Sequence, residues 1–197
     1  GNSGSGCSSV SSPPAIYAES FSVGAISSTN TLASFSSRGP STFYVPNLLK
    51  PNLSAPGVSV RSATNTSDTS FGTLSGTSMA SPHLAGVVAL LWSARPALIG
   101  NIAQTRSILQ GTANPAVTVS TPQTCGGTAS TQIPNNSFGY GRVDALAAVT
   151  APTAANVRVS GRVTTTDGRG IRDAIVSLTG PNSPPIFART NAFGYFT

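Results

Sequence analysis

A serine that could act as a nucleophile lies in residues 74–86, which read Leu-Ser-Gly-Thr-Ser-Met-Ala-Ser-Pro-His-Leu-Ala-Gly. Apolar residues recur after Ser78 with helical spacing, so we expect a helix that begins near Ser78 and lies deep inside its domain. The first turn of a helix leaves N–H groups unpaired and carries the positive end of the dipole, which favours a developing oxyanion. Pro82 has no N–H to donate to the Ser78 carbonyl, which an ordinary structural helix would avoid. Ser78 is therefore a candidate nucleophile, with a simple helix-capping serine as the alternative.

His83 is the only histidine in the chain and so the first candidate for a general base. On a regular helix, five residues place it about 140° around the axis from Ser78 and about 7.5 Å along it. A side chain in that position cannot easily reach the serine of its own helix. We therefore expect a structural role for His83, and the sequence offers a nucleophile without its base.

The block Gly76 to His83 resembles the active-site serine motif of the subtilisin-like serine proteases, or subtilases. In that family the motif is Gly-Thr-Ser-Met-Ala-(Ser or Thr)-Pro-His, followed by a hydrophobic helix. A generic Gly-x-Ser-x-Gly elbow fits less well, because Ala80 replaces the second glycine. Other segments resemble the family in chain order: Gly-Asn at 1–2, Ser-Val-Gly-Ala at 22–25, Ala-Ser-Phe-Ser-Ser-Arg-Gly-Pro at 33–40, Lys-Pro-Asn-Leu-Ser-Ala-Pro-Gly at 50–57 and Phe-Gly-Tyr-Gly-Arg-Val-Asp-Ala at 138–145. Asn52 departs from the pattern, since an aspartate that we take to be structural is usual there.

The resemblance implies that residues 1–150 are the C-terminal part of a subtilase catalytic domain. The expected fold is α/β and subtilisin-like, with a largely parallel sheet and flanking helices, present here in part. Ser78 would attack the scissile carbonyl, and the Asn2 side chain would donate to the oxyanion together with the Ser78 N–H. Gly1, Ser3 and Gly4 would border the substrate-binding pocket.

The family's catalytic aspartate and histidine precede the serine, and no matching contexts occur in this sequence. We therefore expect the chain to be inactive by itself. It also looks cut at both ends, because it opens on Gly1-Asn2-Ser3-Gly4 without a strand to anchor it and stops at Phe196-Thr197 within a strand-like pattern. Asp144 follows the serine and would be in the wrong place for the triad acid, so we expect a structural role for it.

A linker at residues 151–156 separates this domain from a second pattern. Residues 157–197 alternate apolar and polar positions between turns, which predicts strands. Their Ser-Gly-x-Val, Asp-Gly and Phe-Gly-Tyr-Phe elements resemble carboxypeptidase-regulatory-like modules. We expect a truncated start of that small all-β sandwich, with no chemistry of its own.

The charge pattern narrows the range of partners. Only 8% of residues are charged, and the formal net charge of +6 comes from arginines scattered along the chain rather than from a basic run. We therefore expect no nucleic-acid binding, and we interpret the arginines at 158–172 as a solvated face. No apolar run reaches the 18 or so residues of a membrane span.

Cys7 and Cys125 are the only cysteines, and their spacing matches no metal or redox motif. In a secreted protein they would most simply form one disulfide, worth about 3–5 kcal/mol. Two unrelated buried thiols are the alternative. Asp68 is a conceivable calcium ligand in a subtilase, but one carboxylate among hydroxyls does not assign a metal site, and no organic cofactor is implied.

The sequence and the resemblance together predict a secreted or cell-surface serine endopeptidase that acts on protein or peptide substrates as a monomer. Low charge, many Ser and Thr residues, the cysteine pair and the appended module all favour export. The competing class is a non-catalytic surface or adhesion protein that keeps a subtilase-like scaffold for binding, and the missing base favours that alternative.

Overall fold

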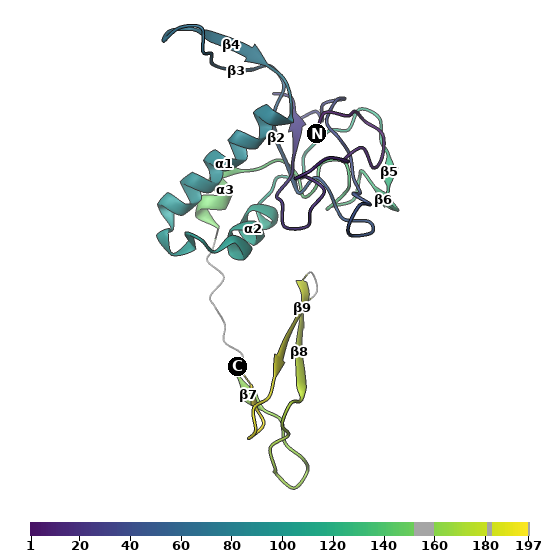
Figure 1. Ribbon diagram of the computed structural model, residues 1–197, viewed down its shortest axis with the longest axis vertical. Helices are drawn as coiled ribbons and strands as arrows, with labels where there is room; N and C mark the ends of the chain where they lie inside the picture. The colour runs from purple at the N-terminus through teal and green to yellow at the C-terminus, as the bar shows by residue number, and fades with distance from the viewer. Residues whose placement is uncertain (152–159, 181–182, 197) are drawn as a thin grey trace. The chain divides into compact units, whose positions relative to one another are not determined.

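The computed structural model describes residues 1–151, 160–180 and 183–196, and it divides into two compact units, Gly1–Ala151 and Pro152–Thr197 (Figure 1). The first unit contains β1 (Val23–Ile26), β2 (Leu53–Pro56), β3 (Val60–Ala63), β4 (Phe71–Leu74), α1 (Thr77–Ala94), the 3₁₀-helix η1 (Pro96–Leu98), α2 (Ile102–Gly111), β5 (Thr124–Cys125), β6 (Thr128–Ala129) and α3 (Ala145–Thr150). The second unit contains β7 (Gly161–Arg162), β8 (Ile175–Gly180), β9 (Ser183–Arg189) and β10 (Tyr195–Phe196).

A parallel strand pair forms the centre of the first unit. β1 and β2 run in register from Val23 opposite Leu53 to Ile26 opposite Pro56, and all four residues of β1 are buried. The short apolar run at residues 21–26, bounded by polar turns, predicts a buried strand, and β1 confirms it. The other pairs among the described residues, β3–β4 and β5–β6 in this unit, are antiparallel, so the expected largely parallel sheet is represented here by one pair.

Helix α1 packs one side against β1, β2 and α3. Its buried residues are Thr77, Ala80, Leu84, Val87 and Leu91, which recur with the three- and four-residue spacing of one helix face. We predicted a helix buried deep in the domain, and this is wrong for the face of α1 that points away from β1, β2 and α3. Leu90 on that face is 56% exposed, because none of the described residues covers it. None of the described helices, α1 included, is long and apolar enough to cross a membrane.

The end of β2 and the start of α1 approach each other closely at Gly57. A Cβ at this residue would lie 2.7 Å from the Ala25 Cβ and 2.8 Å from the Gly76 carbonyl oxygen. The Gly76 N–H also donates to the Gly57 carbonyl at 2.8 Å. Glycine at position 57 therefore allows the sheet to fix the position at which α1 begins.

The other helices begin at capping side chains. Asn101 accepts a hydrogen bond from the Gln104 N–H at the start of α2, and Asp144 accepts one from the Ala147 N–H at the start of α3. Apolar Ile102, Ile108 and Leu109 predict an amphipathic helix within residues 101–111, and α2 confirms it. Asp144 is thus a cap, in agreement with the structural role expected for it.

The segment that precedes β1 is held by hydrogen bonds and a disulfide rather than by regular secondary structure. The Gly4 N–H donates to the Phe35 carbonyl and the Val10 N–H to the Arg38 carbonyl. A disulfide joins Cys7 to Cys125 of β5, across 118 positions of sequence. The predicted pairing is confirmed, and the alternative of two unrelated thiols is excluded.

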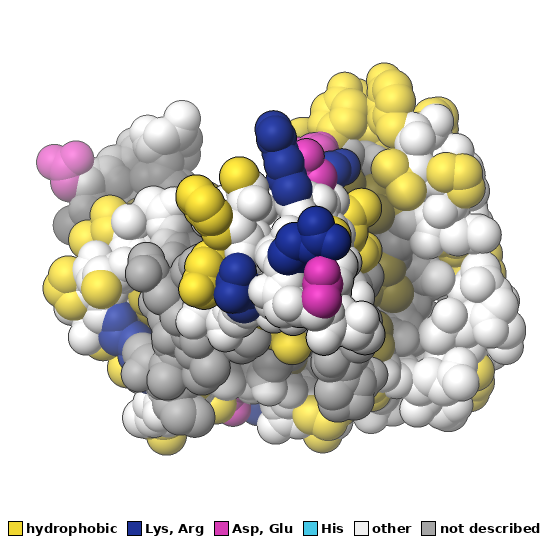
Figure 2. All heavy atoms as spheres, turned by 90° about the horizontal axis from the view of Figure 1, so that it is seen from below, with side chains coloured by type: hydrophobic (Ala, Val, Ile, Leu, Met, Phe, Trp, Pro, Cys, Tyr) yellow, Lys and Arg dark blue, Asp and Glu magenta, His cyan; other side chains and the backbone are white. Residues whose placement is uncertain are grey.

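The second unit consists of two antiparallel pairs, β8 with β9 and β7 with β10. Arg169 and Arg172 form ion pairs with Asp167 and Asp173, at 2.9 and 3.2 Å. In Figure 2, which views the molecule from below, basic and acidic side chains are interspersed rather than gathered into one basic patch. Two separate strand pairs do not test the predicted β-sandwich, and the predicted linker at 151–156 lies almost wholly outside the described residues.

Lys50 is a buried cation near the centre of the first unit. Its side chain is fully buried, and its Nζ donates to the Ser20 carbonyl at 2.7 Å. Burial lowers the pKa of Lys50 from 10.5 to about 8, with the positive charge of Arg106 acting in the same direction and Glu19 opposing it. The folded protein therefore releases this proton more readily than the unfolded chain does.

We expect Lys50 to make stability rise with pH. Below pH 8 the cation stays charged in both states and its burial costs free energy, whereas this cost disappears as pH increases from about 8 to 10.5. Substitution of Lys50 by Met removes the titrating group and should flatten the rise. Urea unfolding of parent and variant at pH 7–11 measures the difference. Burial also lowers the pKa of Arg38 to about 10, but Arg38 is present in both proteins, so its contribution cancels. Parallel pH profiles would contradict the expectation.

Candidate active site

Ser78 is the second residue of α1 and is exposed. The N–H groups of Met79 and Ala80 both donate to the Gly76 carbonyl, at 3.0 and 3.3 Å. The Ser78 N–H has no acceptor among the described residues, as the first turn of a helix requires. An exposed hydroxyl thus lies beside an unpaired N–H and the positive end of the helix dipole.

The Asn2 side chain is bound to the same helix terminus. Its Oδ1 accepts two hydrogen bonds from Thr77, one from the N–H and one from the hydroxyl, both at 2.9 Å. Because the Thr77 N–H can donate to the amide oxygen but not to the amide nitrogen, these hydrogen bonds fix which side-chain atom of Asn2 is Oδ1 and which is Nδ2. The Nδ2 group is left without an acceptor among the described residues and lies near Gly76, where an added Cβ would be 3.3 Å from it.

Two unpaired donors therefore lie at one helix terminus, although the loop that carries Asn2 is 75 residues from Thr77 in sequence. Such donors stabilise the negative charge that develops on a carbonyl oxygen during acyl transfer. The structure brings together Asn2 and the start of the Ser78 helix, as the sequence reasoning expected.

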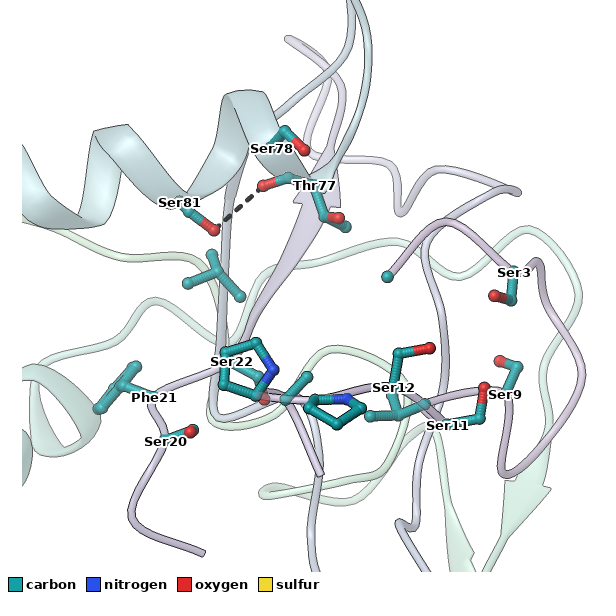
Figure 3. A pocket seen from close by; sticks show the side chains of 16 residues that line it. Ser3, Ser9, Ser11, Ser12, Ser20, Phe21, Ser22, Thr77, Ser78 and Ser81 are labelled. Carbon is teal, nitrogen blue, oxygen red and sulfur yellow. Dashed lines mark hydrogen bonds between the residues drawn. The ribbon is translucent and has the colours of Figure 1, made fainter. Parts of the chain in front are cut away.

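A cavity of about 250 Å³ opens beside Ser78. Figure 3 shows Thr77 and Ser78 on one side of it and the loop that carries Ser11 and Ser12 on the other. Gly1 and Ser3 line the cavity, whereas Gly4, the third residue expected at this border, does not. A substrate side chain entering this cavity would lie next to the candidate nucleophile.

His83 does not approach Ser78 as a base would. Its Nδ1 lies 2.8 Å from the Met79 carbonyl of its own helix, and the ring is exposed. Since the sequence contains no other histidine, the 197 residues hold no Ser–His pair. Asp68 lies in the exposed turn between β3 and β4, and the described residues contain no cluster of three potential metal ligands.

Sequence reasoning missed three residues of this region. Thr77 orients the Asn2 amide, and its position directly before the serine was the available signal. Ser11 and Ser12 line the cavity, but a Gly-, Ser- and Pro-rich segment indicates by itself only an exposed turn.

Asn52, which stands where the family has an aspartate, is buried, and its Oδ1 accepts a hydrogen bond from the Ser22 N–H at 2.8 Å.

An α/β unit with a serine at a helix N-terminus and an amide donor beside it is the arrangement of a serine hydrolase. The model of the subtilase family, peptidase family S8, matches residues 1–141. The chain belongs to the subtilase family.

Curated relatives agree with this assignment. Bacillopeptidase F of Bacillus subtilis is 36% identical over 175 residues, which cover 88% of this chain and 10% of that protein. Subtilisin amylosacchariticus of Bacillus subtilis subsp. amylosacchariticus is 41% identical over 114 residues, which cover 57% of this chain and 26% of that protein. The chain thus spans about a quarter or less of the length of these two relatives.

Solved structures have the same fold. Fervidolysin from Fervidobacterium pennivorans, a keratinolytic enzyme related to subtilisin, is 26% identical, with a TM-score of 0.51 over 93% of this chain and 27% of the other. Sphericase is 30% identical, with a TM-score of 0.56 over 73% of this chain and 45% of the other. The described elements of the first unit are therefore part of a subtilisin-like α/β fold.

Proposed function

We propose that this chain carries the nucleophile and the oxyanion-binding group of a subtilisin-type serine endopeptidase that acts on protein or peptide substrates. Ser78 Oγ attacks the scissile carbonyl carbon, its proton passes to a base, and the C–N bond then breaks to leave an acyl-serine that water hydrolyses. The oxyanion is held by Asn2 Nδ2 and the Ser78 N–H. The observation that carries the proposal is the Asn2 amide, which two Thr77 hydrogen bonds hold with its N–H₂ group unpaired beside Ser78.

The histidine base and its aspartate come from residues outside these 197 in this proposal, because the one histidine present, His83, faces its own helix. We call the polypeptide that contains this chain together with those residues the complete catalytic domain. The isolated chain should then be inactive. The disulfide and the low charge support a secreted or cell-surface location, and we propose a monomer without an organic cofactor.

Covalent labelling tests the proposed nucleophile. The complete catalytic domain and the isolated chain are treated with a fluorophosphonate, and the modified residue is found by peptide mass spectrometry. We expect rapid labelling of Ser78 in the complete domain and none in the isolated chain. Ser93→Ala in the complete domain is the control, because it removes another exposed serine of the same helix α1. This variant should still be labelled at Ser78.

The second candidate is a non-catalytic surface or adhesion protein that uses the subtilase scaffold for binding. The observation that favours it is the absence of a base from this sequence. Labelling separates the two, because a binding scaffold has no activated serine. A complete domain that folds but neither labels nor cleaves peptides would contradict the peptidase proposal and favour the second candidate.

Thr77 should act as a positioning residue for the Asn2 amide. We expect Thr77→Ala to lower kcat about ten-fold with little change in KM, since one of the two hydrogen bonds on Asn2 Oδ1 is lost and the amide rotates more freely. Thr77→Ser keeps the hydroxyl and should restore most of kcat. An unchanged kcat in the alanine variant, or an equal loss in the serine variant, would contradict this role.

A further inference from the structure

Asn2 lies in a segment whose position does not come from regular secondary structure. Residues 1–8 contain no helix or strand, and all of them except the half-buried Gly4 are exposed. The backbone at Gly4 and Gly6 is also open, because a Cβ added at either residue would meet nothing within 4 Å. Packing therefore contributes little to the position of Asn2.

Hydrogen bonds tie one side of this segment to residues 35–39. The Ser3 N–H donates to the Ser37 Oγ and the Gly4 N–H donates to the Phe35 carbonyl, each at 2.9 Å. Water competes with such bonds at an exposed segment, so the net contribution of each one to stability is modest. These bonds alone hold the segment weakly.

The disulfide ties the same segment to the interior of the first unit. Cys7 is five positions from Asn2 and is bonded to Cys125 of β5. Cys125 is 1% exposed, and its carbonyl accepts a hydrogen bond at 3.0 Å from the Nδ2 of Asn136, which is buried as well. The crosslink thus joins an exposed segment that carries Asn2 to a fixed point in the interior.

The chain beyond the crosslink is held independently of it. Val10 is 4% exposed, and its N–H donates to the Arg38 carbonyl at 3.0 Å. Residues 9–15, which line the cavity beside Ser78, therefore keep their own anchor when the disulfide is broken. Loss of the crosslink should free mainly residues 1–8.

A dithiol reductant can open this disulfide from its Cys7 end, because Cys7 is exposed. One thiolate of the reductant attacks Cys7 Sγ, the S–S bond breaks, and Cys125 leaves as a thiolate that takes up a proton. The second thiolate of the reductant then attacks its own bound sulfur, and Cys7 leaves as a thiolate that takes up a proton. Both cysteines are reduced, and the reductant is oxidised to its disulfide.

We infer that Cys7 and Cys125 are positioning residues for the oxyanion donor Asn2, so that turnover depends on the redox state of their disulfide; this rests on the proposed peptidase function. In the oxidised state the crosslink restricts residues 1–8 and keeps the Asn2 amide at the start of α1. In the reduced state the two Thr77 hydrogen bonds and a few exposed backbone bonds are left to hold it. A donor that is displaced part of the time stabilises the transition state less.

Kinetics of the complete catalytic domain before and after reduction test the inference. The domain is treated with dithiothreitol, the free thiols of Cys7 and Cys125 are counted by alkylation and mass spectrometry, and the fold is checked by circular dichroism. We expect reduction to lower kcat about ten-fold while KM changes less than about two-fold. Removal of the reductant and reoxidation should restore kcat.

Two variants show whether the crosslink acts through the amide. The double variant Cys7→Ser/Cys125→Ser should have the low kcat of the reduced enzyme with or without dithiothreitol, which also controls for effects of the reductant elsewhere in the domain. In Asn2→Ala the donor is already absent, so reduction should change kcat by less than about two-fold. A merely structural crosslink would lower kcat equally in the Asn2→Ala variant and in the parent.

The outcomes separate this inference from the function on which it rests. An active domain that keeps its kcat after both thiols are detected would overturn the inference alone, as would an equal loss in Asn2→Ala. Unfolding on reduction would also overturn it, because the crosslink would then support the whole first unit. If the double variant fails to fold during expression, reduction of the folded parent still decides. An oxidised, folded domain with neither labelling nor cleavage would overturn both the function and the inference.

Discussion

Replacing Ser78 by alanine in the complete catalytic domain is expected to lower kcat by about 10⁶-fold. The expected size is that measured for removal of the serine in subtilisin, a relative of this chain, where the loss equals that of the whole triad. The physical reason is that Ser78 Oγ is the only group proposed to form the acyl intermediate, so the two-step route closes. The measurement is kcat on a peptide substrate, with the residual rate compared with the uncatalysed reaction.

The matched control is Ser93→Ala, which removes a hydroxyl from the exposed C-terminal end of the same helix. Its kcat should equal that of the parent. Both variants should have parental circular dichroism, because both positions are exposed. A Ser78→Ala enzyme that keeps more than a hundredth of the parental rate would show that another residue is the nucleophile.

Replacing Asn2 by alanine is expected to lower kcat by about 10²–10³-fold while KM changes little. The magnitude is the one known for loss of an oxyanion donor in subtilisin, the family example, and is adopted here. The Asn2 N–H₂ group has no acceptor among the described residues, so we expect its hydrogen bond to form as the oxyanion develops. An interaction made mainly in the transition state appears in kcat rather than in KM.

Asn2→Asp distinguishes the donor from its supporting contacts. Aspartate keeps an oxygen that can accept both Thr77 hydrogen bonds, but it has no N–H and adds negative charge beside the oxyanion. We expect a loss at least as large as that in Asn2→Ala. Near-parental activity in Asn2→Asp would show that the Thr77 contacts, and not the amide donor, explain the importance of Asn2.

Local patterns in the sequence were enough to predict the elements that hold the site. The apolar spacing after Ser78 predicted α1, the short apolar run at 21–26 predicted β1, and Asn101 marked the start of α2. These features depend on neighbours within a few residues, and the spacing of residue types records them directly.

Features that depend on distant segments were predicted only with the help of the family resemblance, or not at all. Gly1-Asn2 by itself is an ordinary turn signal, and the sequence does not record that the Asn2 amide meets Thr77 75 positions later. Likewise, an apolar pattern indicates that Leu90 could be buried but does not say what would cover it. The lining of the cavity beside Ser78 is hidden for the same reason, because it is assembled from four separate stretches of chain.

The disulfide between Cys7 and Cys125 also affects the timing of assembly during synthesis. A ribosome adds about 5–20 residues per second, so about 4–15 s separate the synthesis of Asn2 from that of Thr77. The crosslink that anchors the Asn2 loop forms later still, after residue 125 has been made. The loop that carries Asn2 therefore gains its covalent anchor to β5 only after most of the first unit has been made.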